Sequence, residues 1–349
     1  MHRYAFLLYH MPKNGVAFRH TTWVVLVLGL MLSACAGSSG IDPLPEDSDE
    51  PGWHEGTLQH DGVERVFRFY LPETLPDNAP TVVLLHGGTQ SMDAIFRSRA
   101  GGTNAWPVVA EEENFLLVVP NGINPGTGAP TGDDQFWNDC RARGTVDSPQ
   151  SEADDVGFIM ELEAWAQSRF SSSPDRLYVT GVSNGGQMAY RLAIEHPQRI
   201  AGIAAFIANL PVESECEKPS VPVPVFMANG TADPITPFEG GEANGRGPFI
   251  SAPDTRDLWV EASNADTTQR EETPLPDRDP DDGSVVICED DPATENGASV
   301  RFCRIEGGGH TMPSVEHGIP RWIRRIVGPQ NRDVEGARLA WAFLQSQSR

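Results

Sequence analysis

Residues 177–186, LYVTGVSNGG, decide the fold of this chain. Residues 177–180 form a short, mostly apolar run, which is typical of a strand that is buried on both faces of a parallel sheet. The pattern G-x-S-x-G follows at residues 181–185 and opens a helical pattern that must end before Pro197. This order predicts a tight strand-to-helix turn that lifts Ser183 above the sheet.

The rest of the chain repeats this alternation of short apolar runs and helical patterns. Helical spacing is found at residues 156–170, and again at residues 337–344 near the C-terminus. Pro224 lacks an N–H donor, so pairing in the strand expected at residues 223–227 should begin near Val225. The alternation is typical of an α/β domain with a mostly parallel central sheet flanked by helices. Further strands are expected at residues 65–71, 81–85, 115–119, 203–207 and 300–305.

Three side chains in this pattern suit nucleophilic catalysis. A serine hydroxyl is a weak nucleophile and needs a base within hydrogen-bond reach. His310 is the best placed of the nine histidines, because the glycine run at residues 307–309 joins it to the last strand. The base needs a carboxylate to hold its tautomer, and Asp233 comes just after residues 223–227. The sequence therefore predicts Ser183 as nucleophile, His310 as base and Asp233 as the third member.

Backbone N–H groups near the serine are expected to bind the oxyanion of the intermediate. The Asn184 N–H is the first candidate, because it lies at the helix N-terminus. The second is expected in the loop after residues 81–85, at Gly88 or Thr89. Close by in the expected site, Trp137 either lines the substrate cleft or packs in the core.

Together these motifs resemble the esterase family that contains polyhydroxybutyrate depolymerases, feruloyl esterases and acetyl xylan esterases. The resemblance covers residues 52–345 in the right order. It implies the α/β-hydrolase fold, with Ser183, Asp233 and His310 as the triad. This chemistry needs no cofactor, and the sequence has no CxxC or HExxH motif that would support a zinc site. The matching motifs are residues 85–90 (LHGGTQ), 154–159 (DDVGFI), 181–186 (GVSNGG), 230–234 (GTADP) with 237–238 (PF), and 307–311 (GGGHT).

Two features depart from the family. Met312 stands where members often have Trp, and residues 264–298 are longer and more acidic than usual. That segment is expected to run over the surface. Both features are expected near the entrance of the site, so they bear on the identity of the substrate.

The resemblance implies a serine ester hydrolase that acts on polyhydroxyalkanoate-type polyesters or on feruloyl and aryl esters through an acyl-enzyme, and the N-terminal pattern described below predicts that it is exported. An acetyl xylan esterase or a general short-chain esterase is the alternative within the family. Two rivals come from other classes. One is a serine peptidase, because the same triad cleaves amides. The other is a catalytically silent surface module that binds polymer, although a binder has no need of an intact triad and glycine-rich loop.

The composition is strongly acidic, with 26 Lys and Arg against 49 Asp and Glu, a formal net charge of −23. This charge argues against nucleic acid as a partner. It is also expected to repel anionic polymers, which favours neutral polyesters or neutral arabinoxylan as substrates. The length of 349 residues is enough for one large domain with its own core, and the oligomeric state stays open.

The N-terminus has the pattern of an export signal. Residues 23–32, WVVLVLGLML, are too short to span a bilayer, which takes about 20 residues, but they fit the apolar region of a signal peptide. Residues 32–35, LSAC, resemble the lipobox of bacterial lipoproteins, in which the cysteine, here Cys35, is lipidated and becomes the new N-terminus. Either Met1 or Met11 is the start of the chain.

Four further cysteines follow, and export would place them in an oxidising compartment. Cys288 and Cys303 lie on two expected strands joined by a polar loop, so we expect them to pair with each other. That leaves Cys140 to pair with Cys216. Four buried free thiols are the alternative.

The chain thus divides into three expected parts. Residues 1–35 are a lipoprotein signal peptide with its lipobox, residues 36–52 a flexible acidic tether, and residues 53–349 the α/β-hydrolase catalytic domain. This predicts a protein lipid-anchored at the outer membrane or cell surface, with a periplasmic or secreted protein as the alternative. Its expected partners are an ester or polyester substrate and the membrane that holds the anchor.

Overall fold

The computed structural model describes residues 49–142, 149, 151–242 and 247–349. The expected signal peptide with Cys35, and residues 36–48 of the expected tether, lie outside them. The chain divides by its contacts into two units, Met1–Ser38 and Ser39–Arg349, and every described residue belongs to the second. In the part of the chain that the structure describes, no helix is long and apolar enough to cross a membrane.

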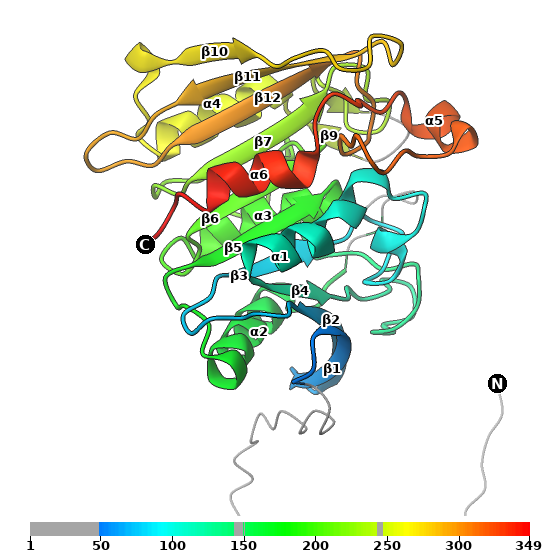
Figure 1. Cartoon of the computed structure of the whole chain (residues 1–349), viewed down its shortest axis with the longest axis vertical. Helices are drawn as coiled ribbons and strands as arrows, with labels where there is room; N and C mark the ends of the chain where they lie inside the picture. Colours follow the sequence, from blue (N-terminus) through cyan, green and yellow to red (C-terminus); the bar gives the residue numbers. More distant parts are fainter. Residues whose placement is uncertain (1–48, 143–148, 150, 243–246) are drawn as a thin grey trace, which may run out of the picture. The chain divides into compact units, whose positions relative to one another are not determined.

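The second unit is built on a ten-stranded sheet with the order β1-β2-β4-β3-β5-β6-β7-β12-β11-β10 (Figure 1). Its strands from β4 to β12 in this order run parallel, and antiparallel strands complete both edges. Burial on both faces explains why the central strands read as continuous apolar runs. The strands are β1 (Gly52–His60), β2 (Val63–Leu71), β3 (Thr81–Leu85), β4 (Leu116–Pro120), β5 (Leu177–Val182), β6 (Gly202–Phe206), β7 (Val225–Gly230), β10 (Glu271–Pro274), β11 (Val285–Asp291) and β12 (Val300–Glu306).

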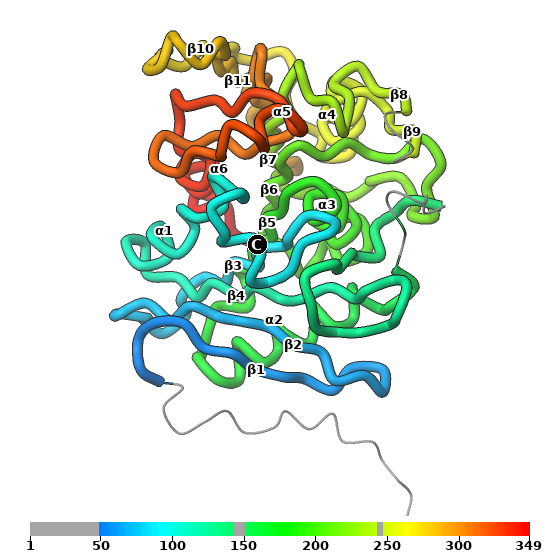
Figure 2. The backbone as a smooth tube through the Cα atoms, turned by 90° about the vertical axis from the view of Figure 1, so that its right-hand side faces the viewer, coloured from blue at the N-terminus to red at the C-terminus, as the bar shows by residue number. Residues whose placement is uncertain are grey.

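Helices cover both faces of the sheet. Helices α2, α3 and α4 pack in one apolar cluster, and α1 and α6 pack in the other. Figure 2 shows α1 and α6 on one side of the sheet, with α3 and α4 on the other. The helices are α1 (Trp106–Glu113), α2 (Asp155–Phe170), α3 (Asn184–Glu195), α4 (Ala252–Ala262), α5 (Arg321–Val327) and α6 (Gly336–Leu344). Shorter elements are the 3₁₀ turns η1 (Ala94–Phe96), η2 (Gly101–Ala105) and η3 (Thr267–Gln269), and the hairpin of β8 (Gly241–Glu242) and β9 (Pro248–Phe249).

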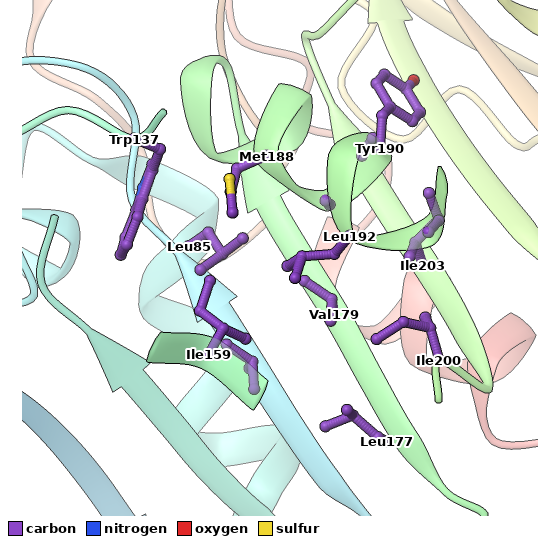
Figure 3. Packing of buried hydrophobic residues seen from close by; sticks show 14 of the residues in the cluster. Leu85, Trp137, Ile159, Leu177, Val179, Met188, Tyr190, Leu192, Ile200 and Ile203 are labelled. Atoms are coloured by element: carbon purple, nitrogen blue, oxygen red, sulfur yellow. The ribbon is translucent and has the colours of Figure 1, made fainter. Parts of the chain in front are cut away.

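The alternation of side chains along each strand divides the core into these two clusters. Leu85 and Val179 face α3, where they pack with Met188 and Leu192 (Figure 3). Their neighbours in sequence, such as Leu84, point to the opposite face and join the cluster under α1 and α6. The turn between β5 and α3 is therefore fixed by apolar packing on both faces of the sheet.

This architecture confirms the predicted α/β-hydrolase fold class, with a mostly parallel sheet flanked by helices. Pairing of β7 with both neighbours begins at Val225, as expected from the preceding proline. Residues 264–298 are more than a surface excursion, however, because β10 and β11 lie within them and extend the sheet. All residues of β10 are exposed, and its sequence, EETP, lacks the apolar alternation that predicts a strand. An edge strand pairs its backbone on one side only, so it can form without an apolar face.

Both expected disulfides are present. Cys288 and Cys303 stand opposite each other on β11 and β12, so the register of the sheet itself brings the two sulfurs together. Cys140 and Cys216 join two loops that are 76 residues apart in sequence.

Removing the long-range disulfide is expected to destabilise the protein more than removing the local one. In the chain-entropy model, a cross-link over 76 residues stabilises by about 4–5 kcal/mol, and one over 15 residues by about 3 kcal/mol. Urea unfolding of the double variant Cys140→Ser/Cys216→Ser should therefore show the lower midpoint, with Cys288→Ser/Cys303→Ser between it and the wild type. Equal or reversed losses would contradict this order.

Candidate active site

Ser183 occupies a strained turn between β5 and α3. Its φ of 54° and ψ of −122° lie in a region that side-chain-bearing residues rarely adopt. The flanking glycines are required by close contact, because a Cβ on Gly181 would lie 2.3 Å from the Gly185 carbonyl oxygen. A Cβ on Gly185 would lie 2.4 Å from the carbonyl oxygen of Leu85. The G-x-S-x-G pattern thus records how closely α3 approaches the ends of β3 and β5.

His310 and Asp233 form a buried pair. Nδ1 of His310 lies 2.7 Å from Oδ2 of Asp233, and their side chains are 9% and 1% exposed. The other carboxylate oxygen, Oδ1, accepts the N–H groups of Ile235 and Thr236 at 2.7 and 2.8 Å. The backbone N–H of His310 donates to the Val327 carbonyl at 2.6 Å. Both partners are therefore fixed by further bonds, and Nε2 is the ring nitrogen left for the cavity.

Ser183 and His310 line the same cavity, which has a volume of about 320 Å³. The structure thus brings the predicted nucleophile and base to one wall, with the predicted third member behind the base. Met312, one of the two departures from the family, also lines the cavity. The other departure, residues 264–298, supplies none of the lining residues. Most of the wall is apolar and includes Phe136, Ile207, Phe249, Met312, Ile319 and Ile323.

Two backbone N–H groups at this wall are free to bind an oxyanion. Asn184 is the first residue of α3, where an N–H has no partner within the helix. Of the two candidates in the loop after β3, the Thr89 N–H is taken by the carbonyl of Gln135 at 3.0 Å. The Gly88 N–H has no hydrogen-bond partner in the part of the chain that the structure describes. The hydrogen bonds therefore favour Gly88 over Thr89.

His86 fixes the loop that presents Gly88. The imidazole is fully buried, its Nδ1 donates to the Gly87 carbonyl at 2.8 Å, and its Nε2 accepts the Gly122 N–H at 3.0 Å. Burial lowers the pKa of His86 from 6.5 to about 4, so the ring stays neutral at neutral pH. The sequence patterns gave this residue no role. A histidine directly after a buried strand is the signal that points to it.

Trp137 belongs to the core, so the expectation that it lines the substrate cleft is wrong. Its side chain is fully buried, and its Nε1 donates to the His86 carbonyl at 2.9 Å. Figure 3 shows the ring beside Leu85 and Met188 in the cluster under α3. Its neighbour Phe136 lines the cavity instead. The alternative of a core tryptophan is therefore the correct one.

The Asn184 side chain ties the start of α3 to the loop that carries Trp137. Its Oδ1 accepts the Trp137 N–H at 2.7 Å, and its Nδ2 donates to the Asp139 carboxylate at 2.6 Å. Asp139 in turn pairs with Arg141 at 2.9 Å, next to the disulfide of Cys140. This network was not foreseen, because it joins residues of ordinary loop composition that lie about 45 positions apart.

A buried ion pair also supports the loop that carries Trp137. Arg65 of β2 binds Asp155 of α2 at 2.6 Å, with both side chains at most 2% exposed. The second oxygen of Asp155 accepts the Asn138 N–H at 2.7 Å. Burial raises the pKa of Asp155, while the Arg65 charge opposes the rise. The motif at residues 154–159 thus stabilises the loop that carries Trp137 and does not line the cavity.

A fold and site of this kind define an α/β-hydrolase. The family described as Phospholipase/Carboxylesterase matches residues 74–246. NocK of Nocardia uniformis subsp. tsuyamanensis, a protein named as an esterase, is 30% identical over 299 residues, which cover 81% of this chain and 80% of NocK. The chain therefore belongs to this esterase family and is a carboxylic ester hydrolase of the serine hydrolase type.

More distant similarities agree with the family and the fold. The poly(3-hydroxybutyrate) depolymerase of Ralstonia pickettii is 28% identical over 183 residues, which cover 50% of this chain but only 35% of the depolymerase. The solved structure of the acetyl xylan esterase from Aspergillus awamori has a TM-score of 0.51 at 13% identity, and the match covers 74% of this chain and 95% of that structure. At this identity the structural match shows the fold alone.

The buried His86 predicts a distinct loss of stability in mild acid. Its ordinary pKa is 6.5 and its folded pKa is about 4, so the unfolded chain takes up a proton that the folded chain excludes. Between these pH values the free energy of unfolding should fall by about 3 kcal/mol from this group. Urea unfolding across the range should show a steeper fall for the wild type than for His86→Gln. Identical pH profiles would contradict the assignment.

Proposed function

We propose that Ser183, His310 and Asp233 are the catalytic triad of an esterase that works through an acyl-enzyme. Ser183 Oγ attacks the ester carbonyl carbon while His310 Nε2 takes its proton. The carbon–oxygen bond to the alcohol then breaks, and His310 returns the proton to the leaving oxygen. Water, deprotonated by His310, attacks the acyl-serine and releases the acid. The pair of His310 with Asp233 at 2.7 Å, on the wall that also carries Ser183, is the observation that supports this most strongly.

Asp233 serves to orient the base. Because its Oδ2 is bonded to Nδ1, that nitrogen carries the ring proton and Nε2 is the acceptor for the serine proton. Two backbone N–H groups hold the carboxylate in its position. The charge then stabilises the imidazolium that forms when Ser183 attacks.

We assign the oxyanion hole to the Asn184 and Gly88 N–H groups. The helix dipole of α3 adds positive potential at the Asn184 N–H. A side chain at position 88 would force the ring of Phe136 to shift, since its Cβ would lie 2.7 Å from that ring. Preorganised donors of this kind contribute about 3–4 kcal/mol each to transition-state stabilisation.

The substrate that we propose is a polyhydroxyalkanoate-type polyester or a feruloyl or aryl ester. The family resemblance of the motifs and the similarity to a poly(3-hydroxybutyrate) depolymerase support this choice. A cavity of about 320 Å³ with apolar walls suits a short or aromatic acyl group. An acetyl xylan esterase or a general short-chain esterase is the second choice, since such a cavity also admits acetate.

We propose that the mature protein is exported and held in a membrane by a lipid on Cys35. The apolar run at residues 23–32 and the lipobox at residues 32–35 support this. The two disulfides agree with an oxidising compartment. A surface location suits an enzyme whose polymeric substrate is too large to import.

Removing any triad member should abolish ester hydrolysis without unfolding the protein. Ser183→Ala and His310→Ala are expected to lower kcat by similar amounts, about four orders of magnitude or more, because the members act as a unit. Asp233→Asn should cost about four orders of magnitude. Turnover is measured on p-nitrophenyl butyrate, methyl ferulate, 3-hydroxybutyrate oligomers, acetylated xylan and a peptide, with circular dichroism as the check on folding.

Matched controls are available for these variants. Ser220 is exposed and His54 lies on β1 away from the cavity, so Ser220→Ala and His54→Ala should keep wild-type turnover. Near-wild-type kcat in Asp233→Asn would mean that another carboxylate is the third member. Turnover of the peptide alone would favour a peptidase, and inertness of the folded wild type towards every substrate would favour the silent binding module.

Replacing Cys35 should block lipidation. Cys35→Ser removes the thiol that the proposed lipid occupies, so the protein should stay unprocessed or leave the membrane fraction. Mass spectrometry of the mature N-terminus and detergent partitioning give the readout. A wild-type protein with an unlipidated N-terminus elsewhere in the chain would contradict the proposal.

A further inference from the structure

The mouth of the active-site cavity has a charge opposite to that of the protein as a whole. Arg99 lines the cavity from the loop between η1 and η2. No aspartate or glutamate is among the lining residues, although the whole chain has 49 of them against 26 basic residues. Within the described residues, the Arg99 guanidinium makes no ion pair or hydrogen bond. Asp133 interacts electrostatically with Arg99, but its carboxylate oxygens are hydrogen-bonded to Nη1 and Nη2 of Arg97 at 2.5 and 3.1 Å.

Helix α5 adds further positive charge beside Arg99. Ile323 and Ile326 of this helix line the cavity, and the helix also carries three arginines. At helical spacing these arginines lie on the face turned away from the cavity wall, so they act through their field rather than by contact. None of them forms an ion pair with a described residue. The three are Arg321, Arg324 and Arg325.

The loop of Arg99 and the segment that leads into α5 are in direct contact. A Cβ on Gly101 would lie 2.9 Å from Cγ2 of Ile319, and one on Gly102 would lie 2.5 Å from the Pro313 carbonyl oxygen. Such close packing fixes Arg99 beside the wall that α5 supplies. Most other arginines of the described chain have carboxylate partners, as do Arg65, Arg97, Arg199, Arg270 and Arg338. Arg99 is thus a lining residue of the cavity that has no carboxylate partner among the described residues.

We propose that this cavity takes esters that carry a free carboxylate, and that Arg99 binds the carboxylate while the ester lies at Ser183. The inference rests on the proposed function of Ser183. An exposed, unpaired guanidinium can bind a carboxylate by donating two parallel hydrogen bonds to its oxygens. The apolar wall meanwhile takes the hydrocarbon part of the same molecule. An acid-terminated oligomer of a hydroxy acid has all three features: a carboxylate, an ester and short aliphatic units.

The test compares two substrates that differ only in charge. The 3-hydroxybutyrate dimer as its free acid is set against the same dimer as its terminal carboxamide, which is isosteric and neutral. Monomer release is followed by chromatography. The wild type should favour the acid by about tenfold in kcat/KM, and Arg99→Gln should remove most of this preference. Raising the salt concentration from about 0.02 M to about 0.5 M should reduce it further, since screening weakens an exposed charge.

Arg349→Gln is the matched control, since it removes the same charge near Asp175, at the opposite end of β5 from Ser183. It should leave the ratio between acid and amide unchanged. Calorimetric binding of both dimers to Ser183→Ala makes the same comparison without turnover. Equal affinity and equal kcat/KM for acid and amide, or equal losses on both in Arg99→Gln, would overturn the carboxylate site while ester hydrolysis stands. Undiminished turnover in Ser183→Ala would instead overturn the proposed triad.

Discussion

The close approach of helix α3 to the ends of β3 and β5 is the constraint on which the site depends. Glycine at position 181 leaves room for the Gly185 carbonyl of α3, and glycine at position 185 leaves room for the Leu85 carbonyl of β3. The same approach forces Ser183 into a positive φ, which a serine adopts only when its surroundings hold it there. The packing of α3 on Leu85 and Val179 keeps Ser183 in this conformation. The position of the proposed nucleophile is thus a consequence of how the core packs.

A second layer of contacts fixes what surrounds the serine. His86 holds the loop of Gly88, Trp137 packs under it, and Asn184 joins both to the start of α3. The buried pair of Arg65 and Asp155 carries the support through to β2 and α2. The side chains of these residues act by supporting the backbone around the cavity. They keep the backbone N–H groups at fixed positions, which is what stabilisation of an oxyanion requires, because donors that must reorganise lose their advantage.

The fold and the positions of the three proposed triad residues could be predicted because each is marked locally. Ser183 stands in a strand–turn–helix pattern, and Asp233 and His310 each follow a buried strand. What could not be predicted depends on pairs of distant loops. The sequence around Trp137 would look the same whether its side chain lined the cavity or packed in the core. Its hydrogen bond to the His86 carbonyl, which follows β3, assigns it to the core. Likewise β10 has no apolar signal, because its place comes from the edge of a sheet that forms elsewhere.

Net charge does not describe the field inside the cavity, for a physical reason. A formal charge of −23 describes the field far from the protein, where salt screens it within about 8–10 Å. A substrate in the cavity responds to nearer groups, and there Arg99 stands without a carboxylate partner in the described chain. Surface acidity can therefore keep the protein soluble while the mouth of the cavity attracts an anion. The expectation that repulsion favours neutral polymers concerns the outer surface, whereas the carboxylate site proposed at Arg99 concerns the group that enters the cavity.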